Sequence, residues 1–232
     1  MLKVYGVQLT QEPAPALLEA LLSALPAHKQ ARIKRFLRPA DALRSLTADI
    51  LSRYILCQYL GIHNGEISFT ENSYGKPALH GTEGLHFNHS HSGRWVVSVI
   101  ADTHCGIDVE EIREADLAIA EHFFAVQEIA DLLAAPEERR RDCFFDLWTL
   151  KESYVKAAGR GLSLPLSSFA IRKEVSGGIT LQTQNEFRDC HFKQYQIDPD
   201  YKMSVCAQSR DFPGQLEVIP QDELYGHFLH LV

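Results

Sequence analysis

Apolar residues recur at helical spacing in two stretches of the first half of the chain. Leucines between residues 17 and 25 end at a proline, and a longer pattern runs over residues 42–60 before Gly61. Asp41 stands where the N-cap of the longer helix is expected. Each pattern predicts an amphipathic helix that buries one face against the rest of the protein.

Strand-like sequence lies beside these helices. Residues 2–9 alternate weakly between apolar and polar, and residues 85–88 and 94–101 are two β-like segments separated by the polar sequence HSHSG. We expect this polar sequence to be a loop. The first half therefore combines helices that bury one face with a small sheet.

The second half shows a similar order of patterns. A short strand at residues 106–110 precedes two helical stretches, the second over residues 142–158, and β-rich sequence follows. We expect an α+β fold of two similar lobes, residues 1–103 and 104–232, with the active site in the cleft between them.

The composition is that of a packed globular protein. The chain has 232 residues, of which 45% are hydrophobic and 23% are charged. Its apolar runs are far shorter than the ~20 residues of a membrane-spanning helix, and residues 1–13 lack the apolar core of a signal peptide. Five widely spaced cysteines without a C-x-x-C pair favour reduced thiols. We expect a cytoplasmic protein with no membrane partner.

Charge is distributed unevenly along the chain. The net charge of -7 disfavours nucleic acid as a partner. Residues 28–53 nevertheless carry seven Lys and Arg against two acidic residues, whereas residues 101–146 carry thirteen Asp and Glu against four Arg. Two solvated helical faces would account for this pattern. So would one site that binds a polyanion at its basic end and a divalent cation at its acidic end.

The sequence GIDVE at residues 106–110 places two carboxylates close together. Side chains two apart on a strand project from one face, so Asp108 and Glu110 share a small volume while Ile107 and Val109 point into the core. Hard oxygen ligands without Cys or His beside them suit Mg2+ or Mn2+. The alternative is an ordinary exposed strand face.

The amphipathic helix that includes residues 148–157 adds further charged groups. Glu152 and Lys156 lie four residues apart and therefore on one face of the helix. An exposed salt bridge would explain this pair alone. A third carboxylate and an ammonium, following a strand that already offers two carboxylates, favour a site for a metal ion and phosphate instead.

Several motifs together resemble one enzyme family. GIDVE, FFAVQE and WTLKESYVKAAGRGLSLPL, with YGKPAL, FNHSHSGRWVVSV and YKMSVCA, resemble the phosphopantetheinyl transferases of the surfactin-synthetase (Sfp) type over nearly the whole chain. The resemblance implies a monomer of two pseudo-twofold related lobes. It also implies Mg2+-dependent transfer of 4'-phosphopantetheine from coenzyme A to a serine of an acyl or peptidyl carrier protein, with release of adenosine 3',5'-bisphosphate. Residues 112–124 match part of the carrier-binding surface.

The resemblance further implies roles for individual residues. Asp108, Glu110 and Glu152 match the metal ligands, and Lys156 matches a phosphate contact that acts in catalysis. The residues that match contacts to coenzyme A are Lys29, Arg32, Arg44, Ser45, Lys76, Pro77, Ser90 and His91. Either Glu152 acting directly or Glu128 acting through a water molecule would accept the serine proton, and we favour Glu152.

Three alternatives to the transferase are a zinc site and two other uses of the same pocket. His86, His89 and His91 are close in sequence, but only the last two share a strand face and no Cys or carboxylate is spaced to complete a zinc site. A metal-dependent nucleotide pyrophosphate hydrolase would use water as its nucleophile. A non-catalytic coenzyme A-binding module would need the pocket but not three carboxylates.

Overall fold

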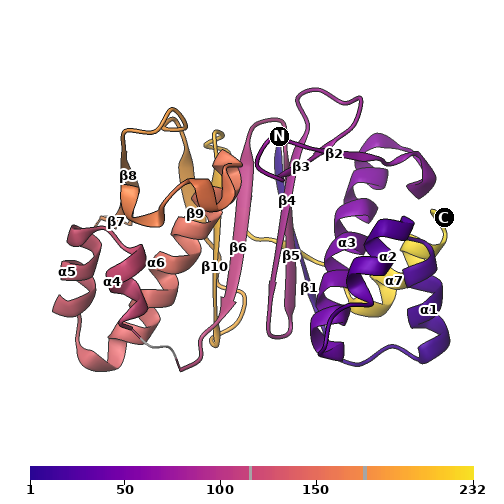
Figure 1. Cartoon of the computed structure of the whole chain (residues 1–232), viewed down its shortest axis with the longest axis horizontal. Helices are drawn as coiled ribbons and strands as arrows, with labels where there is room; N and C mark the ends of the chain where they lie inside the picture. The colour runs from indigo at the N-terminus through magenta and orange to yellow at the C-terminus, as the bar shows by residue number, and fades with distance from the viewer. Residues whose placement is uncertain (115–116, 175–176) are drawn as a thin grey trace.

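Two sheets pack face to face at the centre of the computed structural model, which describes residues 1–114, 117–174 and 177–232 (Figure 1). The first sheet has the strand order β11-β1-β5-β4, formed by Glu217–Val218, Leu2–Gln8, Trp95–Ala101 and His86–Ser92. The second has the order β6-β10-β9, formed by Cys105–Glu111, Tyr201–Ala207 and His191–Gln194.

Helices form an outer layer on each side (Figure 1). The first sheet is covered by α1 (Pro15–Ser23), α2 (Ala27–Ile33), α3 (Pro39–Leu60) and α7 (Gln221–Leu229). The second is flanked by α4 (Ile119–Phe123), α5 (Val126–Ala134) and α6 (Glu137–Ala158). None of the helices in these described ranges is long and apolar enough to cross a bilayer.

Short elements complete the chain. Two small hairpins pair β2 (Phe69–Glu71) with β3 (Pro77–Leu79), and β7 (Phe169–Lys173) with β8 (Ile179–Thr183). Single 3-10 turns lie at Asn64–Glu66, Gly161–Ser163 and Leu166–Ser168.

Alternation along the strands sends side chains into separate hydrophobic cores. On β5, Val97 and Val99 point toward the second sheet and pack in one cluster with Ile107 of β6. Val96 and Ile100 point the other way, into the cluster beneath α3. A further cluster lies between α6 and the outer face of the second sheet. The α+β class expected from the sequence is confirmed.

The expectation of a loop at HSHSG was wrong. β4 continues to Ser92, and the chain turns only at Gly93, whose φ is +52°. The polar side chains are stable in a strand because Ser90 and Ser92 both donate hydrogen bonds to carboxylates of β6.

Two helix starts also differ from expectation. Asp41 is not the N-cap of α3, which begins at Pro39 after Arg38 and holds Asp41 in its first turn. The fixed φ of proline suits this first helical position. α6 begins at Glu137 after Pro136, earlier than the periodicity of its apolar residues indicates.

The C-terminal segment returns to the first half of the chain. β11 pairs in parallel with β1, and α7 packs beside α3, where Tyr225 Oη lies 2.6 Å from Thr47 Oγ1. Figure 1 shows this yellow helix among the helices of the first half. The boundary between residues 103 and 104 stays a prediction, with the segment from residue 217 onward lying beside the first lobe.

Candidate active site

β6 presents two carboxylates on the face that points toward α6. Asp108 and Glu110 alternate with Ile107 and Val109, which are buried in the layer between the sheets. Asp108 is only 3% exposed, and Glu110 is half-buried. The alternation inferred for this strand is confirmed.

A glycine allows α6 to approach β6 closely. A Cβ atom at Gly106 would lie 2.2 Å from the Ser153 carbonyl oxygen and 2.3 Å from the Ala157 amide nitrogen. A larger residue would therefore force helix and strand apart. The close approach brings Glu152 and Lys156, one helical turn apart, beside the carboxylates of β6.

These side chains line a cavity of about 400 Å³ between the two halves. Its walls are His89, Ser90 and His91 from β4, Asp108 and Glu110 from β6, and Trp148, Glu152 and Lys156 from α6. The structure thus brings together the three carboxylates expected to bind metal and three of the residues expected to contact coenzyme A, Ser90, His91 and Lys156.

Only one of the two carboxylate oxygens of Asp108 accepts hydrogen bonds from the described residues. Oδ1 accepts hydrogen bonds from Lys156 Nζ at 2.6 Å and from Ser90 Oγ at 2.9 Å. Lys156 Nζ also donates to Ser90 Oγ at 2.9 Å. Oδ2 is buried and has no hydrogen-bond partner among the described residues. Burying such an acceptor is unfavourable unless a cation or a donor reaches it.

Burial raises the pKa of all three carboxyl groups. Desolvation raises the pKa of Asp108, although Lys156 and Ser90 act in the opposite direction. Desolvation and the charge of Asp108 raise the pKa of Glu110 to about 7, and the same two causes raise the pKa of Glu152. A cation among them would stabilise their ionised forms.

The donor set fits a hard divalent cation. Mg2+ binds through a few protein carboxylates and completes its octahedron with water and phosphate oxygens. Such an ion would satisfy Asp108 Oδ2 and offset the repulsion that raises the pKa of Glu110 and Glu152. Within the described residues, no three His, Cys, Asp or Glu side chains already converge into a metal cage. Water and substrate oxygens would therefore complete the coordination.

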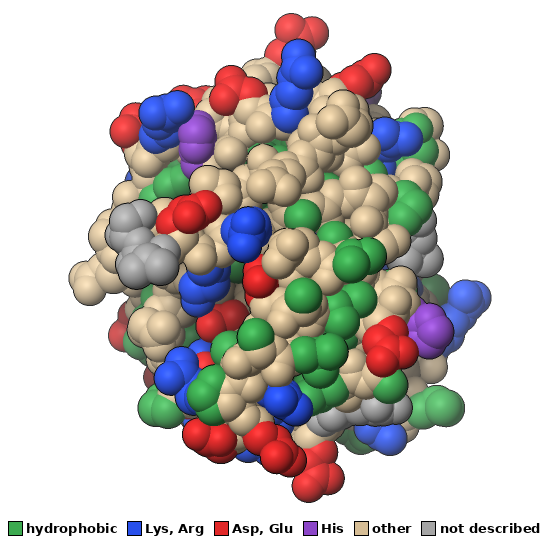
Figure 2. All heavy atoms as spheres, turned by 90° about the vertical axis from the view of Figure 1, so that its left-hand side faces the viewer, with side chains coloured by type: hydrophobic (Ala, Val, Ile, Leu, Met, Phe, Trp, Pro, Cys, Tyr) green, Lys and Arg blue, Asp and Glu red, His purple; other side chains and the backbone are tan. Residues whose placement is uncertain are grey.

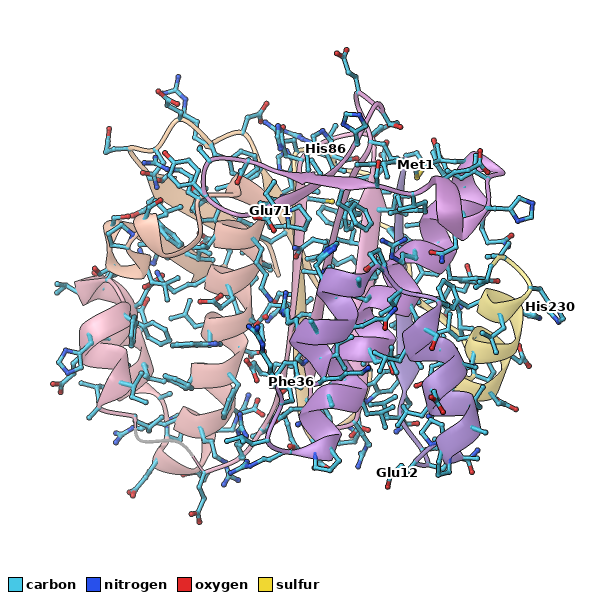
Figure 3. The ribbon with its side chains drawn as sticks, turned by 45° about the vertical axis from the view of Figure 1, so that its right-hand side comes forward. Met1, Glu12, Phe36, Glu71, His86 and His230 are labelled. Carbon is cyan, nitrogen blue, oxygen red and sulfur yellow. The ribbon has the colours of Figure 1, made fainter. Side chains whose placement is uncertain are left out.

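The basic residues of α2 and α3 lie on the other side of β4. Lys29 Nζ donates to Asp49 Oδ1 at 2.8 Å, and Arg44 pairs with Asp41 on its own helix. The other two residues expected to bind coenzyme A on these helices are Arg32, which is exposed, and Ser45, which is buried. In Figure 3 the labelled Phe36 marks the loop between α2 and α3.

Histidines of β4 connect this basic side to the cavity. Burial, followed by the charges of Arg44 and Lys156, lowers the pKa of His91. Burial lowers the pKa of His89 to about 4, and its Nδ1 lies 2.8 Å from Ser52 Oγ on α3. The ring of His86 instead lies 4.2 Å from that of His104, and Figure 3 shows His86 near Met1, far from Phe36.

A second cavity of about 540 Å³ adjoins the first, with Glu152 and Lys156 lining both. Its other walls include apolar side chains of α4, α6 and the segment after α6, together with Lys76 and Pro77. Lys76 Nζ donates to the carbonyl oxygens of Cys105 at 3.0 Å and Ala157 at 3.2 Å. The Lys76 ammonium therefore joins the β2–β3 turn to the second half of the chain.

Glu128 lies in a buried ion pair outside the walls of both cavities. Its two oxygens accept hydrogen bonds from Lys151 Nζ at 2.8 and 2.6 Å. They also accept bonds from the amides of Ile171 and Ala125, each at 2.7 Å. This carboxylate joins α5, α6 and β7, and its acceptor positions are already used.

Family models match both halves of the chain. The model described as the 4'-phosphopantetheinyl transferase superfamily matches residues 104–206. A second, described as 4'-phosphopantetheinyl transferase, N-terminal, matches residues 10–104.

Characterised relatives match nearly the full length. The 4'-phosphopantetheinyl transferase Sfp of Bacillus subtilis (strain 168) is 36% identical over 223 residues, covering 96% of this chain and 100% of the relative. The 4'-phosphopantetheinyl transferase psf-1 of Bacillus pumilus is 37% identical over 221 residues, covering 94% of this chain and 95% of the relative. The chain belongs to the 4'-phosphopantetheinyl transferase superfamily. A solved structure also matches this transferase, a holo-(acyl-carrier-protein) synthase from Bacillus anthracis in complex with CoA. The two sequences are 18% identical, and the matched region spans 45% of this transferase and 94% of the synthase, with a TM-score of 0.40.

Sequence reasoning assigned no role to three polar side chains of this transferase, Lys151, Asn88 and Ser92. Lys151 partners Glu128, and its position in the apolar stripe of α6 with Leu147 and Tyr154 is a signal that could have revealed its burial. Asn88 and Ser92 bond to β6. The motif FNHSHSGRWVVSV contains both residues, but it does not reveal these bonds, because their partners lie on a strand that is not adjacent to β4 in sequence.

Proposed function

We propose that this protein transfers the 4'-phosphopantetheine group of coenzyme A to a serine hydroxyl of an acyl or peptidyl carrier protein. The serine oxygen would bond to the phosphorus that carries the pantetheine arm. The bond from that phosphorus to the bridging oxygen would break, and adenosine 3',5'-bisphosphate would leave with the electron pair. The observation that carries the proposal is one cavity in which three carboxylates face Lys156, a charge arrangement suited to a diphosphate bound with a divalent cation.

Asp108, Glu110 and Glu152 are the proposed ligands of Mg2+, and Mn2+ has the same ligand preferences. When bound, the ion would neutralise charge on the diphosphate and on the leaving group. Ser90 and Lys156 hold Oδ1 of Asp108, which leaves Oδ2 available as the ligand.

The cations around the cavity would bind the phosphates of coenzyme A. Lys156 lies at the cavity wall, next to the proposed position of the diphosphate. The further proposed phosphate contacts are Lys29, Arg32, Arg44, Ser45, Ser90 and His91. Pro77 lines the second cavity and Lys76 fixes the turn before it, so both would shape the wall beside the adenine.

Glu152 is the proposed base that accepts the serine proton. It lines both the cavity proposed for the diphosphate and the second cavity, beside which the carrier is proposed to dock. A carboxylate beside the proposed cation stays ionised at neutral pH, which is the form that accepts a proton. Glu128 is a weaker candidate because Lys151 and two backbone amides already occupy its oxygens.

The carrier protein would dock beside the second cavity. Exposed apolar side chains of α4 and α5 lie near it, Phe123 at 41% and Val126 at 86% exposure. Figure 2 shows hydrophobic side chains gathered among charged ones on the face of the second half. Within the segment 112–124 expected to contact the carrier, residues 115 and 116 lie outside the described residues. We further propose that the protein acts as a monomer in the cytoplasm.

Mass spectrometry of the carrier protein tests this function. Incubation with coenzyme A, Mg2+ and an unmodified carrier should raise the carrier mass by one phosphopantetheinyl group, and Asp108→Asn should abolish this gain. Cleavage of coenzyme A with no change in carrier mass would instead identify a pyrophosphate hydrolase. Binding of coenzyme A without any reaction, over several carriers, would identify a binding module.

A further inference from the structure

β4 and β6 meet where the two sheets join, and side chains of β4 link them. The amide of Ile107 donates to Asn88 Oδ1 at 3.0 Å, and the amide of Glu111 donates to Ser92 Oγ at 3.1 Å. Between these two bonds, Ser90 Oγ donates to Asp108 Oδ1. Positions 88, 90 and 92 alternate along β4 and so share the face toward β6. Polar side chains of β4 therefore fix the position of β6, and with it the second sheet, relative to the first sheet at this edge.

Ser92 links the backbone of β6 to a carboxylate of the cavity. Its hydroxyl donates to Glu110 Oε2 at 2.8 Å and accepts the amide hydrogen of Glu111. A serine hydroxyl has a single hydrogen, so the bond to Glu110 uses its whole donor capacity. Ser92 is 7% exposed, which limits competition from water for this bond.

The turn after Ser92 is itself fixed. A Cβ at Gly93 would lie 2.1 Å from Tyr201 Oη and 2.8 Å from Glu111 Cδ, so the turn sits directly against the second sheet. Tyr201 Oη accepts a hydrogen bond from the Arg94 amide at 2.8 Å and donates to Glu111 Oε1 at 3.2 Å. The contacts of Gly93 and Arg94 with Tyr201 and Glu111 therefore limit movement of the neighbouring Ser92 relative to Glu110.

We infer that Ser92 is a positioning residue that holds the Glu110 carboxylate in the orientation required for cation binding. The inference rests on the proposed function, because Glu110 matters here as a ligand of the proposed cation site. Partners that hold a metal ligand through a hydrogen bond limit its rotation, and their loss lowers metal affinity by roughly 10- to 100-fold.

Binding of Mn2+ to the protein without coenzyme A tests this inference independently of turnover. Electron paramagnetic resonance of free Mn2+ gives the dissociation constant directly. We expect Ser92→Ala to raise that constant by roughly tenfold or more. Ser92→Thr keeps the hydroxyl and should restore binding. Ser92→Cys has nearly the volume of serine but a weak donor, so it should bind as poorly as alanine and serves if the alanine variant does not fold.

Ser98→Ala is the matched control. Ser98 is fully buried on the neighbouring strand β5, and its Oγ donates to the Asn88 carbonyl oxygen at 3.1 Å, with no carboxylate of the described residues as its hydrogen-bond partner. Its loss should leave Mn2+ affinity unchanged. In carrier assays, Ser92→Ala should raise the Mg2+ concentration needed for half-maximal rate, with a near-normal rate at saturating Mg2+.

Two results would overturn the inference. One is wild-type Mn2+ affinity in folded Ser92→Ala and Ser92→Cys, and the other is an equal loss in Ser98→Ala, which would indicate general packing. Asp108→Ala separates this failure from that of the proposed function. If Asp108→Ala loses Mn2+ while the Ser92 variants retain it, only the positioning role fails. If Asp108→Ala also retains Mn2+, the cation site itself is wrong.

Discussion

α3 and α6 are similar in outline but reach their sheets in different ways. Each spans 22 residues, α3 beginning with Pro39 and α6 following Pro136. Each ends before a glycine with φ of 68°, Gly61 and Gly159. α6 comes within contact of the β6 backbone at Gly106, whereas α3 packs on the first sheet through apolar side chains.

Because of this difference, the acidic side of the site, formed by β6 and α6, is held more rigidly than the basic side, formed by α2 and α3. On the acidic side, Asp108 and Glu152 project from two elements whose backbones touch, so their separation is set by main-chain packing. On the basic side, Lys29 and Arg44 carry their charges at the ends of long stems and pair with acids of the same helical layer. We expect the acidic side to respond strongly to small changes and the basic side to tolerate them.

The largest contrast should come from two glutamates of the second half, Glu152 at the cavity wall and Glu128 in the buried ion pair. Glu152→Gln should lower transfer about a hundredfold or more, because it removes the proposed base and one proposed metal ligand. It should change stability little, because the side chain is half-buried at the cavity wall. Glu128→Gln leaves the Lys151 ammonium buried without a charge partner and should lower the free energy of unfolding by about 3–5 kcal/mol. Urea unfolding and carrier mass measure the two effects.

The opposite result would reverse the roles assigned to Glu128 and Glu152. A Glu128→Gln protein with wild-type unfolding free energy and no transfer would make Glu128 the base. Lys151→Met is the matched control, since it removes the other member of the buried pair. It should also destabilise the protein, because it leaves the Glu128 carboxylate without its ammonium partner.

Gly106→Ala tests the close approach of α6 and β6. The added methyl group would meet backbone atoms of Ser153 and Ala157, which cannot rotate away. We expect a loss of about 3 kcal/mol in unfolding free energy and a large loss of transfer. Gly226→Ala is the control. This glycine lies inside α7, where the added carbon would meet nothing within 4 Å beyond the adjoining backbone of its own helix, so the change should stabilise by about 0.5–1 kcal/mol. Equal stability of the two variants would contradict the packing argument.

Local patterns predicted the acidic side well. Strand alternation placed Asp108 and Glu110 on one face, and helical spacing placed Glu152 with Lys156, because both periods depend only on neighbouring residues. The sequence HSHSG was assigned wrongly for the opposite reason. Its serines are stable in a strand only because β6 lies alongside, a contact that local sequence does not contain.

Long-range packing also determines the features that sequence did not reveal. The burial of Glu128 depends on Lys151, 23 residues away, and the Lys76 ammonium binds carbonyl oxygens in the second half. The return of α7 to the first half depends on contacts such as that between Thr47 and Tyr225. Charge along the chain indicated a basic cluster, but it did not show that Lys29 already has an acidic partner.

Metal binding on the acidic side should depend on pH. The folded pKa of Glu110 is raised from 4.5 to about 7, so this group favours the folded state most at low pH and loses that contribution as pH rises toward 7. Mg2+ binds the ionised carboxylate and should therefore bind more tightly with increasing pH up to about 7. Thermal melts with and without Mg2+ from pH 5.5 to 8 should show a growing stabilisation. Glu110→Gln should flatten this dependence, and a Mg2+ effect that falls with pH would contradict it.

Lys29→Ala on the basic side should have the smallest effect. We expect the KM for coenzyme A to rise roughly fivefold with little change in kcat, because one partly solvated charge contributes on the order of 1 kcal/mol. Raising the salt concentration should narrow the difference from wild type. Lys34→Ala removes an equal charge from an exposed position of the same segment and is the matched control. If both variants raise KM equally, the cluster acts through its total charge. If Lys29→Ala lowers kcat as far as Glu152→Gln does, the basic side is as rigidly required as the acidic side, and the contrast between the two helices fails.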